Sequence, residues 1–110
     1  MARVLLVDDD RELTDGLSIW LGIRGHEVRA VHEARQVVRA AREFGPDLVL
    51  LDAVLGGSSG SSVAADLTEA GVERIVLCTG LPARLLPPGL PVLEKPLRLE
   101  RLEATLAALT

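Results

Sequence analysis

Residues 4–10 have the sequence VLLVDDD, in which four apolar residues lead directly into three aspartates. A run that is apolar on both faces is typical of a strand in a parallel sheet covered by helices on both sides. Similar runs occur further along the chain, and one segment alternates polar and apolar residues, as a half-exposed edge strand does. The predicted strands are Val4–Val7, Glu27–Val31, Leu48–Leu51, Ile75–Cys78 and Val92–Leu93.

The segments between these strands carry apolar residues at helical spacing. After Asp10, which can cap a helix, Leu13, Leu17 and Leu21 fall on one face. Gly45-Pro46 ends the second helical segment, and the third lies between Ser59 and Gly71, which can cap its two ends. Helices are therefore predicted at Arg11–Arg24, Glu33–Phe44, Gly60–Ala70 and Leu97–Leu109.

The connection between the last two strands is too short for another helix. Lys95 follows Thr79 by only 16 positions, and this stretch holds four of the six prolines. Proline inside a helix removes a hydrogen bond and clashes with the preceding turn. We predict that the helix expected here is missing or vestigial, with at most one turn near Ala83–Leu86.

Strands that alternate with helices predict an α/β domain with a parallel sheet. Right-handed crossovers leave few topologies, and the flavodoxin-like, doubly wound order 2-1-3-4-5 places the alternating second strand at an edge. The strand order then reverses between the first and third strands, where ligands bind beyond the carboxyl ends. Asp8, Asp9 and Asp52 would meet at this point.

Three carboxylates in one cleft repel each other. One pair at about 4 Å costs roughly 4 kcal/mol at an effective dielectric constant of about 20. Lys95 or a hard divalent cation such as Mg²⁺ can relieve this repulsion. A cation, Lys95 and the Thr79 hydroxyl can together stabilise a phosphoryl group in transfer, with Asp52 as the nucleophile that accepts it.

These motifs resemble, from end to end, the receiver domain of two-component response regulators. Val4–Asp10 is similar to the first-strand motif with its acidic pair, and Asp47–Gly60 to the segment that carries the phosphoacceptor. Thr79 matches the switch hydroxyl. Lys95-Pro96 matches the lysine and proline of the family, which are usually joined by a cis peptide bond.

The resemblance implies a role for each aspartate of the predicted cluster. Asp52 would be the phosphoacceptor. Asp9 and Asp52 would bind Mg²⁺ directly, together with the backbone carbonyl of Val54, and Asp8 would act through water. Asp10 is expected to be a helix cap.

The same resemblance implies that Lys95 pairs with the phosphoacceptor and then with its phosphoryl oxygen, while Thr79 bonds another phosphoryl oxygen. In receivers, the side chains two positions after the acceptor and after the threonine tune hydrolysis. Here they are Val54 and Leu81, which cannot position a water molecule. We therefore expect a phosphoacceptor with at most slow self-dephosphorylation, and not an enzyme.

The chain departs from the family pattern at several positions. Gly56 replaces a usual proline, Gly80 a usual alanine, and Val92 the usual aromatic switch residue. The glycine- and serine-rich residues 56–62 are expected to form a flexible loop. A phosphorylation-independent pseudo-receiver that binds proteins is thus the alternative. A small phosphatase of related fold would need a second carboxylate two residues after the acceptor, where Val54 stands.

Length and composition narrow the remaining possibilities. The 110 residues fit one receiver domain, residues 1–110, with no output domain, and the net charge of −4 and 2% aromatic content argue against a nucleic-acid partner. No leader and no long apolar run is present, which predicts a cytoplasmic chain without membrane contact. The expected partners are a histidine kinase or phosphotransfer protein and a protein effector, with a monomer favoured.

Overall fold

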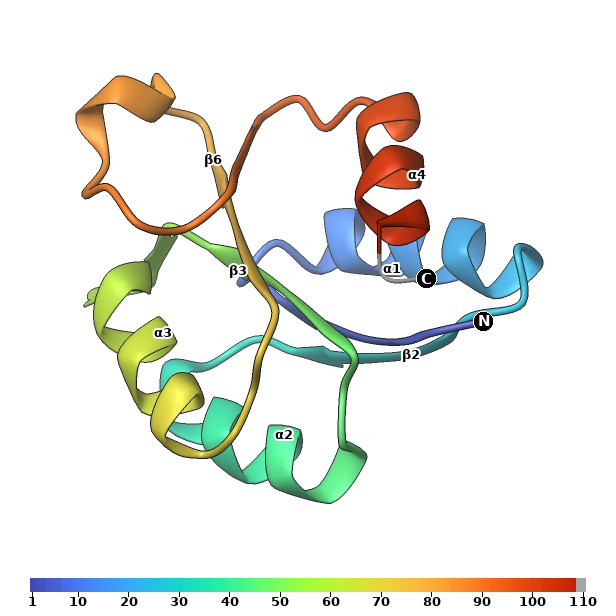
Figure 1. Cartoon of the computed structure of the whole chain (residues 1–110), viewed down its shortest axis with the longest axis horizontal. Helices are drawn as coiled ribbons and strands as arrows, with labels where there is room; N and C mark the ends of the chain where they lie inside the picture. The colour runs from blue at the N-terminus through green and yellow to red at the C-terminus, as the bar shows by residue number, and fades with distance from the viewer. Residues whose placement is uncertain (109–110) are drawn as a thin grey trace.

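The computed structural model describes residues 1–108. Five parallel strands form one sheet in the order β2-β1-β3-β6-β7, which is the predicted flavodoxin-like order (Figure 1). The labels β4 and β5 belong to a separate two-stranded hairpin. The sheet strands are β1 (Arg3–Val7), β2 (Glu27–Val31), β3 (Leu48–Asp52), β6 (Ile75–Thr79) and β7 (Val92–Glu94).

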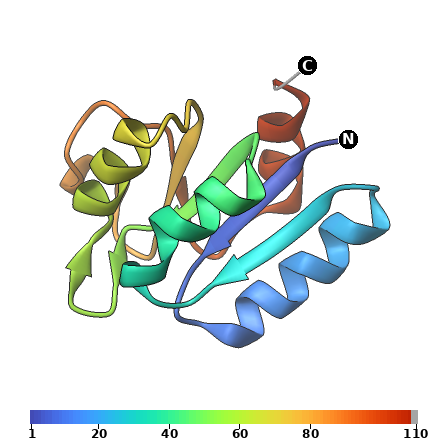
Figure 2. The same ribbon diagram turned by 90° about the horizontal axis from the view of Figure 1, so that it is seen from below.

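Helices cover both faces of this sheet. The α1 helix (Arg11–Ile23) and α4 (Leu99–Ala107) pack on one face, and α2 (Val37–Phe44) and α3 (Gly60–Glu69) pack on the other (Figures 1 and 2). Successive strand residues point to opposite faces, so each face has its own apolar core. No helix within residues 1–108 has the length and apolarity of a membrane span.

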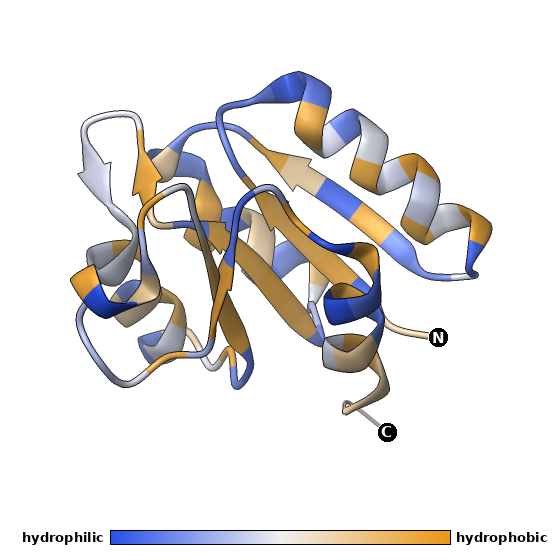
Figure 3. Ribbon diagram, turned by 90° about the horizontal axis from the view of Figure 1, so that it is seen from above, coloured by the Kyte–Doolittle hydropathy of each residue, from blue (hydrophilic) through white to orange (hydrophobic). Residues whose placement is uncertain are grey.

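The burial of the strands follows their sequence patterns. The β1 strand is buried along nearly its whole length, whereas β2 at the edge alternates between exposed and half-buried residues. Figure 3 shows the same contrast, with β2 changing colour from residue to residue beside more uniformly hydrophobic central strands. The alternation therefore marked the edge strand correctly.

The helix boundaries agree with the predicted ones to within a few residues. Asp10 caps α1 by accepting a hydrogen bond from the Leu13 N–H at 3.1 Å. The predicted second helix begins as a 3₁₀ turn, η1 (Ala34–Gln36), before α2. The α4 helix starts two residues later than expected, and Leu109 at its predicted end lies outside the described residues.

The connection between β6 and β7 contains no full helix. Its regular structure is one 3₁₀ turn, η2 (Ala83–Leu85), as the prolines predicted. The β7 strand that follows this connection has three residues and lies at the edge of the sheet.

Residues 54–59 form a hairpin where a flexible loop was expected. The strands β4 (Val54–Leu55) and β5 (Ser58–Ser59) pair antiparallel around Gly56-Gly57, and the buried Leu55 ties the hairpin to the core. Gly56 has a φ of 59°, in the left-handed region that glycine adopts without steric cost. Two glycines between short strands are a hairpin signal, which the flexible-loop interpretation overlooked.

Gly60 connects the hairpin to α3 in very little space. Its N–H donates to the Ala53 carbonyl at 2.7 Å. A Cβ atom at position 60 would lie 2.6 Å from the Asp52 carbonyl oxygen and 2.8 Å from the Ala53 Cα. A side chain at this position would therefore push against the backbone that carries Asp52.

We predict that Gly60→Ala lowers the free energy of unfolding by about 1–3 kcal/mol, because the added methyl group displaces backbone atoms. Chemical denaturation of both proteins measures this change. Gly16→Ala is the matched control, since a Cβ there meets nothing within 4 Å. This control lies inside α1 and should gain about 0.5–1 kcal/mol. Equal stability of Gly60→Ala and wild type would contradict the steric argument.

Candidate functional site at the carboxyl ends of the strands

The carboxyl ends of four strands bring the predicted site residues together. Asp8 and Asp9 follow β1, Asp52 is the last residue of β3, Thr79 is the last residue of β6, and Lys95 follows β7. Parallel strands end at the same edge of a sheet, and the order reverses between β1 and β3. The predicted site residues therefore stand at one edge of the sheet.

Three carboxylates form a cluster at this edge of the sheet. Asp8, Asp9 and Asp52 each offer an oxygen, and these oxygens lie within 4.8 Å of one another. Asp8 is buried and Asp9 is exposed. Asp8 Oδ1 accepts a hydrogen bond from the Asp10 N–H at 2.9 Å, which orients its carboxylate. Within residues 1–108, this oxygen cluster fits a hard divalent cation such as Mg²⁺.

Lys95 provides the positive charge in the cluster. Its Nζ atom donates to Asp8 Oδ2 at 2.8 Å and lies 3.7 Å from Asp52 Oδ1. The resemblance implied that the lysine pairs with the acceptor, but in this structure Asp8 is its closer partner. The Lys95-Pro96 peptide bond is cis, and the Lys95 N–H donates to the Thr79 carbonyl at 2.6 Å.

The surroundings shift the pKa values of Asp52 and Lys95. Burial raises the pKa of Asp52, and the negative charges of Asp8 and Asp9 raise it further. The hydrogen bond from the Val54 N–H and the positive charge of Lys95 lower this pKa, but the pKa is raised overall. Burial alone would lower the pKa of Lys95, but its hydrogen bond to Asp8 and the nearby carboxylates raise the pKa overall. Lys95 is therefore a stable cation, and the ionised form of Asp52 is disfavoured.

Thr79 is buried and bonded within its own turn. Its Oγ1 accepts a hydrogen bond from the Leu81 N–H at 2.9 Å. A hydroxyl that accepts one bond still has a hydrogen to donate. The side chains of Val54 and Leu81, at the two positions expected to influence hydrolysis, are both exposed.

Two further contacts lie near the carboxylate cluster, and one of them was not predicted. Glu94 Oε1 accepts a hydrogen bond from the Ala83 N–H at 3.0 Å and so ties η2 to β7. The close approach of Gly60 to the Asp52 backbone has its signal in the glycines of residues 56–62, which were expected to let backbone approach the site. The Glu94 contact had no clear signal in the sequence, because it joins segments that meet only after folding.

Cys78 plays no part in this cluster. Burial raises the pKa of its thiol to about 12, so the reactive thiolate is scarce at neutral pH.

The sequence model of the response regulator receiver domain matches residues 4–85. The chain belongs to this family. The family accepts phosphoryl groups in two-component signalling.

The curated relatives are longer proteins. The chain is 40% identical over 76 residues to the DNA-binding response regulator MtrA of Mycolicibacterium paratuberculosis. The aligned residues make up 68% of this chain and 34% of that protein. It is 33% identical over 79 residues to the transcriptional regulatory protein CpxR of Klebsiella pneumoniae, covering 72% and 34%. The chain therefore spans about a third of the length of these relatives.

Solved structures agree with the family assignment. The BeF₃-activated receiver domain of Klebsiella pneumoniae RstA superposes with a TM-score of 0.86 at 27% identity, covering 96% of both chains. A CheY-like receiver domain from Methylobacillus flagellatus gives a TM-score of 0.88 at 22% identity, covering 100% of this chain and 99% of that one. At this low identity, the similarity to the Methylobacillus flagellatus domain shows a shared fold.

We predict that Asp52→Asn raises the melting temperature in metal-free buffer by a few degrees, because it removes a disfavoured charge from the cluster. The raised pKa of Asp52 sets the pH dependence. The folded protein holds this proton more tightly than the unfolded chain, so the destabilising charge appears as pH rises through the folded pKa. The advantage of the variant should vanish below the ordinary value of 3.8, where both states are protonated.

The control for this prediction is Asp15→Asn. Asp15 is an exposed residue of α1, away from the cluster, and its variant should melt like wild type at each pH. A neutral or destabilising effect of Asp52→Asn at pH 7 would show that ionised Asp52 does not oppose folding.

Proposed function

We propose that this receiver domain takes a phosphoryl group from a histidine kinase or a phosphotransfer protein onto Asp52, with Mg²⁺, and signals through contact with a protein effector. The convergence of Asp8, Asp9 and Asp52 with Lys95 carries this proposal. Residues 1–110 act as one receiver unit in the cytoplasm in this proposal.

In the proposed transfer, a carboxylate oxygen of Asp52 attacks the phosphorus atom of a phosphohistidine. The new O–P bond forms as the P–N bond breaks, and the bonding pair leaves with the imidazole of the donor. Lys95 Nζ, already 3.7 Å from Asp52 Oδ1, can hold a phosphoryl oxygen after a small movement. The product is an aspartyl phosphate.

Asp9 and Asp52 would hold Mg²⁺ directly with the Val54 carbonyl, and Asp8 through water. The donor atoms are hard oxygens, which Mg²⁺ prefers. A bound Mg²⁺ neutralises negative charge on the carboxylates and on the phosphoryl oxygens. The buried Asp8 remains bonded to Lys95, so one of the three carboxylates has its own cation.

Thr79 is the proposed sensor of phosphorylation. Its hydroxyl would donate to a phosphoryl oxygen on Asp52, and the bond from the Leu81 N–H would weaken as the side chain turns. The Leu81 backbone leads directly into η2, so this movement would reach the segment between β6 and β7.

A phosphorylation-independent pseudo-receiver is the competing function. Val92 at the usual aromatic position and the single turn between β6 and β7 favour it. The two functions differ in whether Asp52 accepts a phosphoryl group.

We predict that incubation with acetyl phosphate and Mg²⁺ adds one phosphoryl group to the chain, as measured by intact mass. Omission of Mg²⁺ should abolish the addition, because the carboxylate cluster then repels the anionic donor. Asp52→Asn should remain unmodified, and Asp9→Asn should lose both the labelling and the rise in melting temperature that Mg²⁺ gives wild type.

Asp10→Asn is the matched control for this experiment, since Asp10 caps α1. It should keep both responses. An unmodified wild-type chain under conditions that label another receiver would support the pseudo-receiver instead.

We also predict a long-lived phosphoaspartate. The apolar side chains of Val54 and Leu81 offer no hydrogen bond to an attacking water. If positioning that water is worth about 1.4 kcal/mol, its absence slows hydrolysis about tenfold. The double variant Val54→Asn, Leu81→Glu should therefore lose its phosphoryl group faster, in a time course of intact mass at saturating Mg²⁺. Equal decay in both proteins would refute this explanation.

A further inference from the structure

The first turn of α1 is bonded to the end of β2, next to the carboxylate cluster. His32 directly follows β2, and its Nε2 atom lies 3.1 Å from the Thr14 Oγ1 atom of α1. One residue earlier, the Val31 carbonyl accepts a hydrogen bond from the Asp8 N–H at 3.1 Å. Residues 31 and 32 therefore contact the connection between β1 and α1 at two points.

The hydrogen bonds of Thr14 show which atom donates in the pair with His32. A threonine hydroxyl has one hydrogen, and Thr14 donates it to the Arg11 carbonyl at 3.1 Å. The same oxygen can therefore only accept a hydrogen bond from the histidine ring. His32 Nε2 thus carries a hydrogen and donates it to Thr14, so the direction of the bond is fixed.

Thr14 lies close to the carboxylate cluster. It is buried, with 1% of its surface exposed. Together with Asp8 and Asp52, it is among the residues that line a cavity of about 10 Å³, which has room for at most one water molecule. Because this space is so small, a displacement of Thr14 would alter the packing beside these two carboxylates.

Asp9 depends on its backbone neighbours for its position. Its exposed side chain takes part in no hydrogen bond or salt bridge with another residue of the range 1–108. On one side of it, the Asp8 N–H is bonded to the end of β2. On the other side, the Asp10 carbonyl accepts a hydrogen bond from the Thr14 N–H at 3.1 Å. Both neighbours of Asp9 are therefore connected to the end of β2, the second of them through Thr14.

We propose that His32 is a positioning residue for the metal site. Its hydrogen bond to Thr14 fixes the first turn of α1 and the Asp10 backbone, and so keeps the Asp9 carboxylate in the cluster. Hydrogen bonds behind a metal ligand orient the ligand and strengthen its binding of the metal. This inference rests on the proposed function, in which Asp9 binds Mg²⁺ directly, and deepens it by adding a residue outside the cluster.

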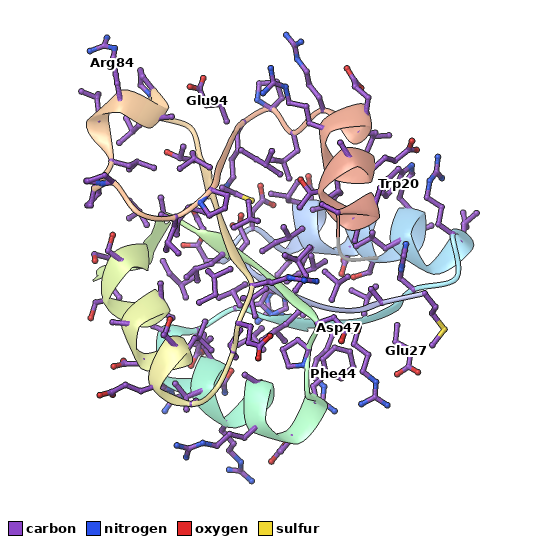
Figure 4. The ribbon with its side chains drawn as sticks, in the orientation of Figure 1. Trp20, Glu27, Phe44, Asp47, Arg84 and Glu94 are labelled. Atoms are coloured by element: carbon purple, nitrogen blue, oxygen red, sulfur yellow. The ribbon has the colours of Figure 1, made fainter. Side chains whose placement is uncertain are left out.

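A second histidine, at the other end of β2, provides a comparison. His26 precedes β2, and its Nδ1 atom accepts a hydrogen bond from the Ala2 N–H at 2.9 Å. Like His32, it is half-buried and bonded to another segment of the chain. Figure 4 shows that Glu27, the neighbour of His26, lies on the opposite side of the molecule from Glu94 at the carboxyl end of β7. The bond of His26 can therefore stabilise the fold without contacting the metal site.

The test measures Mg²⁺ affinity separately from stability. Melting temperatures of the full chain over a series of Mg²⁺ concentrations give both the metal-free stability and the Kd for Mg²⁺, because a cation that binds the folded state raises the melting temperature by mass action. His32→Leu, which removes the donor, should weaken Mg²⁺ binding about tenfold, at the low end of the effect of losing a group behind a metal ligand. Thr14→Val, which removes the acceptor, should weaken it equally.

Two further variants separate the hydrogen bond from the side chains that form it. The double variant His32→Leu, Thr14→Val should bind Mg²⁺ as weakly as each single variant, because both substitutions remove the same bond. His32→Gln should bind Mg²⁺ within about twofold of wild type, because the glutamine amide can donate to the same oxygen.

His26→Leu is the matched control. It makes the same substitution and also removes a hydrogen bond between segments. Its metal-free melting temperature should fall, as in His32→Leu, while its Kd for Mg²⁺ stays within about twofold of wild type, because a loss of stability alone does not change the cation site. Circular dichroism verifies folding, and Thr14→Val decides the test if His32→Leu does not fold.

Several results would overturn the positioning role. These are an unchanged Mg²⁺ affinity in His32→Leu and Thr14→Val, an equal loss of affinity in His26→Leu, or additive losses in the double variant. Labelling of Asp52 by acetyl phosphate, followed by intact mass on the same preparations, separates this inference from the proposed function. If wild type is labelled and the His32 variants bind Mg²⁺ normally, the positioning role fails alone. If Mg²⁺ binding depends on His32 but Asp52 is never labelled, the phosphoacceptor role fails alone. A wild-type chain without any response to Mg²⁺ would refute both.

Discussion

Mutual repulsion among three carboxylates is the constraint on which the site depends. Their oxygens lie within 4.8 Å of one another, and one of the residues, Asp8, is buried. Lys95, which follows strand β7, relieves this repulsion through its 2.8 Å hydrogen bond to Asp8. The site therefore combines an acidic centre that can accept a cation with an internal cation bonded to its buried carboxylate.

Close backbone contacts surround the carboxylate cluster. Gly60 packs against the carbonyl of Asp52, and the Lys95 N–H is bonded to Thr79. By contrast, the connection between β6 and β7 has one 3₁₀ turn, tied to β7 through Glu94. The short connection leaves the carboxylate cluster intact, because the cluster is built from residues at the ends of the strands.

Much of this arrangement was predictable because its causes are local. Apolar runs specified buried strands, the alternation in β2 specified an edge, and the prolines after Thr79 excluded a helix. The hairpin at residues 54–59 was missed because Gly-Gly and serine are common in both flexible loops and tight turns. Only the burial of Leu55 against the core distinguishes the two.

The sequence by itself determined the strand order and the lack of a full helix between β6 and β7. It also determined that Asp8, Asp9, Asp52, Thr79 and Lys95 stand at the ends of strands. Tertiary structure alone decided that Lys95 bonds to Asp8 more closely than to Asp52, that Glu94 holds η2, and that His32 donates to Thr14. The physical reason is that secondary structure follows from neighbouring residues, whereas these contacts join residues distant in the chain. Their distances depend on how all the elements pack at once.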